Sequence, residues 1–442
     1  MRKPNVIIIV CDTLRKDIMD LYGGPAKMPH VGELAEDSAV YENAVAPAPW
    51  TFPSHVSLFT GLYPSQHGIH ESKTMKMPQI VEAHLRSRHT TLAEYLRGKG
   101  YSTLGISANL MISKVTGFDR GFDQFFTFTH SPWIQSDLAT QARNLGADMS
   151  QVALMLLKKG QAKEIAKYGV EYLKIKMRER SMNYPLKKGA EVVNRKAEAM
   201  VQKQPFFLFL NYYEAHEPYK RFSDKETQDH LTGLKQTGKK KVAYLKNQYV
   251  LEAEYLDSEL GKLLSWLKRK NLYDDSLIIL TSDHGQAFNE HGFMYHGIYL
   301  YDEVVRVPMV IKHPQGSKRG TLARYQSLAG IFDMVKRAIE GSKEETGTDF
   351  VYSESFGNAE FFPESYRHRM RYVEKHYEKL RAAIYMDGYK LSVNGSDGTV
   401  DEFMKGDKTV SRNSKAHRKA FGKLSKELEK FKKREAFVVP GR

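Results

Sequence analysis

The 442-residue sequence is poor in cysteine and contains no long apolar segment. Its single cysteine, Cys11, excludes a disulfide bond within the chain and indicates a reducing compartment. The apolar run at residues 6–10 is shorter than the core of about 7–15 residues that a signal peptide needs. No stretch reaches the roughly 20 apolar residues that span a bilayer. We therefore expect a cytoplasmic protein.

The sequence also lacks the features of a specific nucleic-acid binder. It has no recognition-helix motif and no interleaved aromatic and basic residues of the kind that stack on bases. Its net charge of +15 comes from two segments, because residues 158–203 carry +8 and residues 404–442 carry +9. Such runs are usually solvated helix faces, and attraction to a polyanion is the alternative. Under that alternative we predict peripheral contact with an anionic membrane through these two segments, and we expect no specific nucleic acid.

Three continuous apolar runs predict strands that are buried on both faces. They lie at residues 5–10, 205–210 and 276–281. Helices are predicted at 54–61, 91–100 and 250–268, and a further strand at 101–107. Strands that alternate with helices at this spacing are typical of an α/β fold. We therefore expect a mostly parallel central sheet with helices on both faces.

Two segments depart from this alternation. Residues 131–204 are basic and helical in pattern, which indicates an insertion packed on the core. From residue 381 onward, short strands joined by Gly-containing turns precede a last helix at 414–434. We expect a large α/β domain at 1–380, with the insertion at 131–204, and a small C-terminal subdomain of antiparallel β-sheet plus a basic helix at 381–442.

Polar side chains follow the three buried strands directly. Asp12 follows the first strand, residues 211–219 follow the second, and Asp283 and His284 follow the third. Open α/β sheets place their chemistry at this edge. Thr51 lies in a separate loop with the sequence APAPWTFPSH, where a helix cap or a turn is the usual role of such a threonine.

Five stretches make the chain resemble the sulfatase-like branch of the alkaline phosphatase superfamily. In order, they are NVIIIVCDTLRKD at 5–17, APAPWTFPSHVSLFTGLYPSQHG at 46–68, GFDRGFDQF at 117–125, PFFLFLNYYEAHEPY at 205–219 and TSDHGQAFNEHGFMYHGIYLYDEVVRVP at 281–308. Each stretch alone is a weak signal, but the five occur in the order that is typical of the branch. The resemblance covers almost the whole chain, including its C-terminal part.

The resemblance implies a metal site and a nucleophile. Asp12, Asp283 and His284 would bind one divalent ion together with the Thr51 oxygen, and His216 and His296 would lie beside the substrate as catalytic residues. Oxygen and imidazole ligands suit Mn²⁺ or Zn²⁺, with Ca²⁺ or Mg²⁺ as alternatives. Such an ion would lower the pKa of the Thr51 hydroxyl, whereas the hydroxyl of an unassisted threonine keeps its high pKa.

The nucleophile position departs from that of true sulfatases. Those enzymes convert a cysteine or serine into formylglycine, and Thr51 has no such route. A threonine with an Asp-His ligand pair is similar instead to the phosphoglycerol and phosphoethanolamine transferases and phosphodiesterases of the superfamily. We therefore predict a hydrolase or transferase that acts on a phosphate mono- or diester. A sulfatase is the first alternative, and a non-catalytic polyanion-binding protein on the same fold is the second.

Three further residues are candidates for contact with the substrate. His55 stands where the sulfatase signature has arginine, Glu214 lies two residues before His216, and Asn109 follows the predicted strand at 101–107. A helix cap for His55, an orienting contact for Glu214 and a turn for Asn109 are the structural alternatives. The expected substrate is an anionic small molecule or a lipid or glycan ester.

Overall fold

The computed structural model describes residues 3–71, 75, 77–128, 188–219, 238–342, 347–357, 379–395 and 397–434. Most of the insertion expected at 131–204 therefore lies outside the described residues. Within its last part, residues 188–204, the chain forms helix α9 (Ala190–Met200). The expected domain limits stay predictions, but the central sheet and the C-terminal subdomain can be described.

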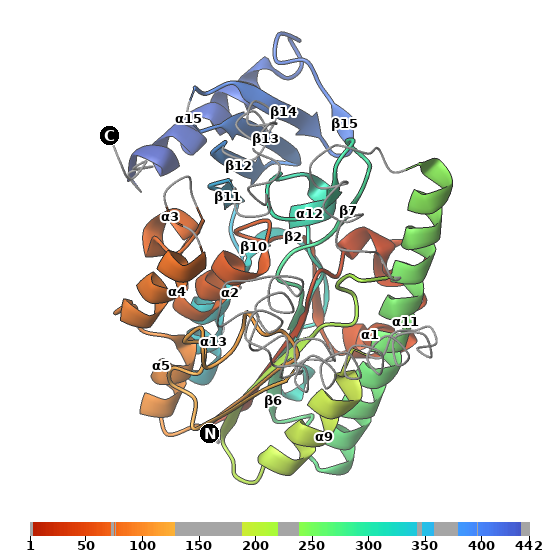
Figure 1. Cartoon of the computed structure of the whole chain (residues 1–442), viewed down its shortest axis with the longest axis vertical. Coiled ribbons are helices and arrows are strands. Elements are labelled where there is room, and N and C mark those ends of the chain that lie inside the picture. Colours follow the sequence, from red (N-terminus) through yellow and green to blue (C-terminus); the bar gives the residue numbers. More distant parts are fainter. Residues whose placement is uncertain are drawn as a thin grey trace, which may run out of the picture.

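An eight-stranded sheet forms the centre of the molecule (Figure 1). Seven strands run parallel, and β9 alone runs antiparallel to its neighbours β2 and β6. In spatial order the strands are β10 (Gly320–Ser327), β2 (Ala39–Val45), β9 (Met309–Lys312), β6 (Ser276–Thr281), β1 (Asn5–Cys11), β5 (Phe206–Tyr212), β3 (Ser102–Ser107) and β4 (Gln124–Thr127). The predicted mostly parallel sheet is confirmed.

Helices cover both faces of this sheet, as expected for strands that are apolar throughout (Figure 1). On β1, Val6, Ile8 and Val10 belong to one core, while Ile7 and Ile9 belong to the other. The first core packs under α2 (Thr51–Thr60), α4 (Met77–Arg86), α5 (Leu92–Gly98) and α13 (Ile331–Ile339). The second packs under α1 (Pro29–Glu36), α9 and α11 (Lys239–Arg269). Two cores of this kind hold the strand ends in fixed positions.

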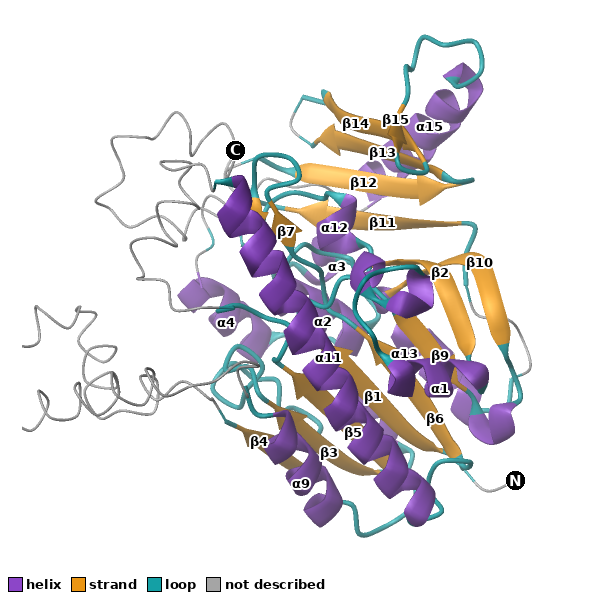
Figure 2. Cartoon of the chain, turned by 90° about the vertical axis from the view of Figure 1, so that its right-hand side faces the viewer, coloured by secondary structure: helices purple, strands orange, loops and turns teal. Residues whose placement is uncertain are grey.

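A second sheet of five antiparallel strands lies at one end of the molecule, with α15 packed on it (Figure 2). Its strands are β11 (Phe350–Ser355), β12 (Arg381–Met386), β13 (Tyr389–Asn394), β14 (Val400–Lys405) and β15 (Lys408–Thr409), followed by α15 (Arg418–Arg434). The expected antiparallel sheet with a helix is confirmed. Its first strand, β11, comes from upstream of position 381.

Short elements complete the described chain near the strand ends. They are α3 (Pro64–His67), β7 (Ala287–Phe288), β8 (Met294–Tyr295) and α12 (Asp302–Val305). Within the part of the chain that the structure describes, every helix is too short or too polar to cross a membrane. The hairpin β7–β8 follows the polar cluster after β6, so it carries the chain from Asp283 and His284 to His296.

Candidate active site

Asp12, Asp283 and His284 meet because their strands are direct neighbours. Strands β1 and β6 run parallel with Val10 opposite Thr281, so the residues that follow both strands emerge at the same edge of the sheet. Asp12 comes directly after β1, and Asp283 lies two positions after the end of β6. All three side chains are fully buried. One carboxylate oxygen from each aspartate and one nitrogen of His284 lie within 4.8 Å of one another.

Thr51 is the first residue of α2 and points its hydroxyl into this cluster. Its side chain makes no capping hydrogen bond, since the cap position is taken by Trp50. The Nδ1–H of His284 donates to the Gly285 carbonyl at 2.9 Å, which leaves Nε2 as an acceptor. The Thr51 hydroxyl donates to this Nε2 atom at 3.2 Å. Thr51 therefore sits with the cluster, and the structure does not support the helix-cap role.

The two aspartates keep one oxygen each available for a cation. Asp12 Oδ2 accepts from Asn109 Nδ2 at 2.7 Å, and Asp283 Oδ1 accepts from the backbone N–H groups of Thr13 and His284 at 3.1 and 2.9 Å. Asp12 Oδ1 and Asp283 Oδ2 are buried and accept no hydrogen bond from any described residue. Burial and the nearby Asp283 carboxylate raise the pKa of Asp12 well above its usual value. A divalent cation would relieve both effects.

The donor set fits a divalent ion. Two carboxylate oxygens, a hydroxyl and one neutral imidazole nitrogen are typical ligands of Mn²⁺, Zn²⁺ or Mg²⁺. The neighbouring Cys11 thiol does not compete, because its residue packs in the apolar core on one face of the sheet. Burial also raises the pKa of Cys11 well above its usual value, so this thiol stays protonated.

His216 and His296 lie beside the cluster, on loops that follow β5 and β8. The His296 ring centroid is 4.4 Å from that of His284 and 5.2 Å from that of His216. Burial lowers the pKa of both His216 and His296, so both rings are neutral at neutral pH. The structure thus gathers six predicted residues in one place: Asp12, Thr51, His216, Asp283, His284 and His296.

The three predicted substrate-binding residues are placed behind these groups. His55 is fully buried, and its Nδ1–H donates to the Thr51 carbonyl one turn back at 2.9 Å. Glu214 is also fully buried, and its carboxylate accepts from the backbone N–H of Ala190 at 2.7 Å. Asn109 binds Asp12, as described above. These contacts support Thr51, the start of α9 and Asp12, so we assign the three residues to positioning the site.

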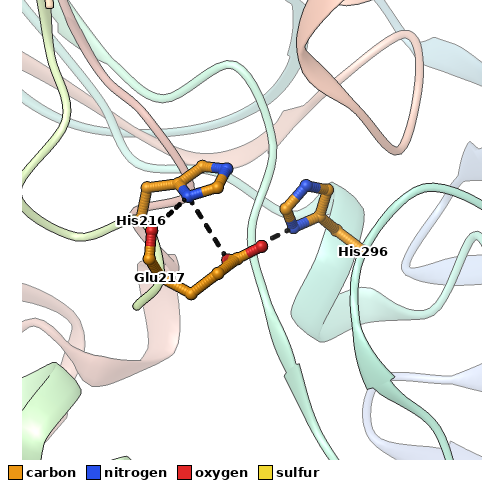
Figure 3. A group of neighbouring side chains, drawn as sticks. All are labelled: His216, Glu217 and His296. Carbon is orange, nitrogen blue, oxygen red and sulfur yellow. Dashed lines mark hydrogen bonds and ion pairs between the residues drawn. The ribbon is translucent and has the colours of Figure 1, made fainter. Parts of the chain in front are cut away.

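Sequence reasoning missed two polar residues next to the histidines. Glu217 follows His216 directly, and Gln286 lies two residues after His284. Gln286 Nε2 donates to Glu217 Oε2 at 2.7 Å, and Gln286 Oε1 lies 2.6 Å from His296 Nδ1. Figure 3 shows Glu217 between the two rings. Their places beside His216 and His284 are the only sequence signal for these residues.

Two buried cations near the site, Arg15 and Lys188, bond to carboxylates and backbone carbonyls of the surrounding loops. Arg15 bonds to Asp17 and Glu290 at 2.6 and 2.7 Å. Lys188 donates to the carbonyls of Glu214 and His216, both at 2.6 Å. Lys188 therefore fixes the loop that carries His216, and neither cation is aimed at the site.

Comparisons with known proteins agree with this architecture. A sulfatase of Escherichia coli K12 without a characterised activity, YidJ, is 21% identical over 344 residues, and the choline-sulfatase of Rhizobium meliloti is 24% identical over 358 residues. These alignments cover 72% and 71% of this chain but only 64% and 63% of those relatives. The chain thus spans less than two thirds of their length.

Solved structures match over nearly the whole chain. A phosphonate monoester hydrolase from Silicibacter pomeroyi has a TM-score of 0.66 at 16% identity, and one from Agrobacterium radiobacter has a TM-score of 0.63 at 17% identity. Each match covers 98% of this chain and 96% of the other. At this identity the likeness shows the fold. A family model described as "Sulfatase" matches residues 4–340, three quarters of the chain. The chain therefore belongs to the sulfatase family.

Proposed function

We propose that this protein is a hydrolase or transferase of phosphate esters, mono- or diesters, that uses Thr51 as its nucleophile. The observation that carries the proposal is the contact between the Thr51 hydroxyl and His284 Nε2 at 3.2 Å, beside two buried carboxylate oxygens that accept no hydrogen bond from described residues. Threonine at this position favours phosphorus over sulfate esters, since the formylglycine route needs cysteine or serine.

Asp12, Asp283, His284 and Thr51 would hold one divalent ion. When bound, the ion lowers the pKa of the Thr51 hydroxyl and screens the negative charge of the ester oxygens. We expect Mn²⁺ or Zn²⁺. The stiffness of the site supports this role, because α2 and two neighbouring strands fix the four side chains before a substrate arrives.

Thr51 Oγ1 attacks phosphorus in line, so the Oγ1–P bond forms while the bond to the leaving oxygen breaks. His216 or His296, neutral at the start, accepts the Thr51 proton at Nε2 and passes it to the leaving oxygen. Water or an alcohol then attacks the phosphothreonine and gives its proton to the same nitrogen, and Thr51 Oγ1 takes the proton back as it leaves. Hydrolysis and transfer differ only in this second acceptor.

Sulfate-ester hydrolysis is the second candidate. It is favoured by the family match and by the sulfatases among the relatives, which include a choline-sulfatase and the Formosa agariphila ulvan-active sulfatase. An anionic small molecule or glycan ester would suit either chemistry. A cytoplasmic location and contact of residues 158–203 and 404–442 with anionic membranes remain our predictions for the cell.

The test is a substrate screen with Thr51 variants. The metal-loaded protein is assayed on p-nitrophenyl phosphate, bis-p-nitrophenyl phosphate and p-nitrophenyl sulfate. We expect turnover on one of the two phosphate esters. Thr51→Ala should lower kcat by at least about 10³-fold, because loss of a nucleophile typically costs several orders of magnitude. Thr51→Ser should keep part of the activity.

Thr60→Ala is the matched control. Thr60 lies at the other end of α2, where its hydroxyl donates to the Val56 carbonyl at 2.7 Å and accepts from the Leu62 backbone N–H at 3.4 Å. This variant should keep wild-type kcat. A preference for the sulfate ester would replace the first candidate by the second. Wild-type kcat in Thr51→Ala would reject Thr51 as the nucleophile.

A further inference from the structure

We propose that Glu217 is a positioning residue that sets the tautomers of both His216 and His296, so that the Nε2 atoms of the two rings serve one reaction centre. The inference rests on the proposed function for its consequence in catalysis, but the tautomers can be measured on their own. Glu217 is one quarter exposed and lies between the two rings (Figure 3). It acts on each ring by a different path.

The path to His296 runs through Gln286. A carboxylate only accepts hydrogen bonds, so the Gln286 group that faces Glu217 Oε2 at 2.7 Å must be the NH₂ group. This orientation turns Gln286 Oε1 toward His296 Nδ1 at 2.6 Å. Because Oε1 also only accepts, His296 Nδ1 must carry a proton. The proton-free nitrogen of His296 is then Nε2.

The path to His216 is direct. His216 Nδ1 lies 2.8 Å from the Glu217 carbonyl, which only accepts, so Nδ1 carries the proton here as well. The Glu217 carboxylate oxygen Oε2 lies 3.4 Å from the same nitrogen and favours its N–H. The stacked Tyr213 ring, 4.2 Å away between centroids, holds the His216 ring plane, and the Tyr213 hydroxyl donates to His216 Nε2 at 3.5 Å.

Both rings therefore turn their proton-bearing nitrogens toward one acidic residue. Figure 3 shows the second nitrogen of each ring on the side away from the Glu217 carboxylate. His296 also packs against the candidate metal ligand His284. One acidic residue thus orients two neutral imidazoles. Under the proposed function, these rings exchange protons with the nucleophile, the leaving oxygen or the incoming acceptor.

The same three residues could instead bind a second metal ion, since one ligand atom from each lies within 4.8 Å of the others. The hydrogen bonds argue against this use. The nitrogens that face Glu217 both donate protons to oxygen acceptors, so neither offers a lone pair there. A metal ligand also needs a deprotonated nitrogen. We therefore favour proton positioning and keep the second ion as an outcome of the test.

The first measurement follows the tautomers without any substrate. Long-range ¹H–¹⁵N spectra of histidine-labelled protein in the metal-free state should show protonated Nδ1 and bare Nε2 at His216 and His296. In Glu217→Gln, the amide at position 217 can face Gln286 with either end, so His296 should populate both tautomers. Unchanged His296 tautomers in this variant would overturn the proposal.

The second measurement separates positioning from general damage. Wild type and Glu217→Gln are assayed on phenyl and p-nitrophenyl esters, both as phosphates and as sulfates. Phenolate needs protonation as it leaves more than p-nitrophenolate does, so kcat/KM for the phenyl ester should fall about 10–100-fold, the usual cost of losing a residue that orients a catalytic histidine. The value for the p-nitrophenyl ester should change little. The ratio of the two is independent of the folded fraction.

Two further variants, and a measurement of the metal bound per chain, complete the test. Glu290→Gln removes a carboxylate of similar exposure that bonds to Arg15 and Lys246, and it should leave the ratio unchanged. Gln286→Met should reproduce the part of the Glu217→Gln effect that reaches His296.

An equal fall of kcat/KM for both leaving groups in Glu217→Gln, or loss of a second equivalent of bound metal from this variant, would overturn the proposal. Turnover of sulfates alone would reject the phosphate assignment and leave the Glu217 test valid on the sulfate pair. A wild-type enzyme inactive on both series would reject the proposed function, and the tautomer measurement would then decide the role of Glu217.

Discussion

The Asp12 carboxylate is oriented mainly by the side-chain amide of Asn109. Its Oδ2 atom accepts from Asn109 Nδ2 at 2.7 Å, while Oδ1 has no hydrogen-bond partner among the described residues. The same Asn109 side chain accepts from the Met111 backbone N–H at 2.9 Å, which ties it to the loop after β3. The Met111 backbone therefore fixes the Asn109 amide, and this amide in turn orients Asp12, a candidate metal ligand.

Asn109→Ala should weaken metal binding. Without the donor, the Asp12 carboxylate can rotate away from the direction that the ion needs, and loss of such an orienting partner typically weakens metal affinity about 10–100-fold. Competition with a chromogenic chelator measures the change. Asn194→Ala is the control, because Asn194 is equally buried but bonds to Glu259 and Tyr212. Equal metal affinities in the two variants would contradict the role of Asn109.

At the scale of single residues, the meeting of the candidate ligands was predictable, and the contacts that support them were not. Asp12, Asp283 and His284 follow apolar strands directly, so their meeting point could be read from the order of elements. The orientation of Gln286 depends on which end of an amide faces Glu217, and no pattern of residue types encodes that choice. His55 was expected at the substrate, but α2 begins at Thr51 instead of Ser54, and this places the His55 ring against the Thr51 carbonyl.

At the scale of elements, the site joins parts of the chain that meet only at the sheet edge. The segments directly after β1 and β6 contribute the two aspartates and His284, and α2 contributes Thr51. Two carboxylates that are buried together repel each other, so the metal-free site opposes the packing of these elements. A bound ion would reverse the sign of this contribution.

Metal removal should therefore lower the melting temperature, and more so near neutral pH than in mildly acidic buffer. An ion present at 100 times its dissociation constant stabilises the fold by about 2.7 kcal/mol. In the metal-free protein the pKa of Asp12 is raised, mainly by burial and then by Asp283. The stabilising contribution of protonated Asp12 is present below its unfolded-state pKa and is lost as the pH rises through the folded-state pKa.

Thermal unfolding with and without a chelator, at both pH values, checks this expectation, and re-addition of the ion should restore stability. Asn109→Ala should show a smaller effect of the chelator than wild type. An identical melting temperature with and without metal would exclude an ion held between β1, β6 and α2.

The strands were easier to predict than the helix limits. The run at 276–281 forms β6 over those same residues, because a doubly buried strand must be apolar throughout. Helix α11 begins at Lys239, earlier than the expected residue 250. Sequence reasoning missed its first turns because they expose lysines and bury only Leu245 and Tyr249. Polar first turns resemble a loop in sequence, although they continue the helix.

At the scale of the whole molecule, the C-terminal sheet is a layer between α15 and the catalytic body. Val351, Ala383 and Tyr385 belong to a core that also includes α2, whereas Ile384 and Leu391 face α15. The sheet begins with β11, which sequence reasoning missed because 25 residues separate it from its partner β12 along the chain. Pairing over such a gap leaves no local pattern.

A buried lysine connects this layer to the catalytic body. Lys390 on β13 is 2.9 Å from Asp302 at the start of α12 and 2.6 Å from Glu402 on β14. The Tyr385 hydroxyl also donates to Asp302 at 2.8 Å. Helix α12 follows the loop that carries His296, so this cluster holds the subdomain against the element next to the site.

Lys390→Met should lower the free energy of unfolding by about 3 kcal/mol, the lower end of the cost of removing one member of a buried ion pair. Burial opposes both charges, yet Lys390 holds the pKa of Asp302 below its usual value, and Asp302 and Glu402 raise the pKa of Lys390. The Asp302 contribution is lost as the pH falls through its lowered pKa, and the Lys390 contribution is lost as the pH rises through its raised pKa. The difference between wild type and variant should be largest between these limits.

Urea unfolding over a pH series measures this difference. Lys423→Met is the matched control, because Lys423 bonds to Asp387 at 2.6 Å on the exposed surface of the same subdomain, where solvent screens the pair. It should change stability little at any pH. If both variants lost the same stability, the Lys390 cluster would contribute no more than a surface pair. Apolar packing and the remaining hydrogen bonds, such as that from the Gly388 backbone N–H to the Tyr325 hydroxyl, would then hold the two parts of the molecule together.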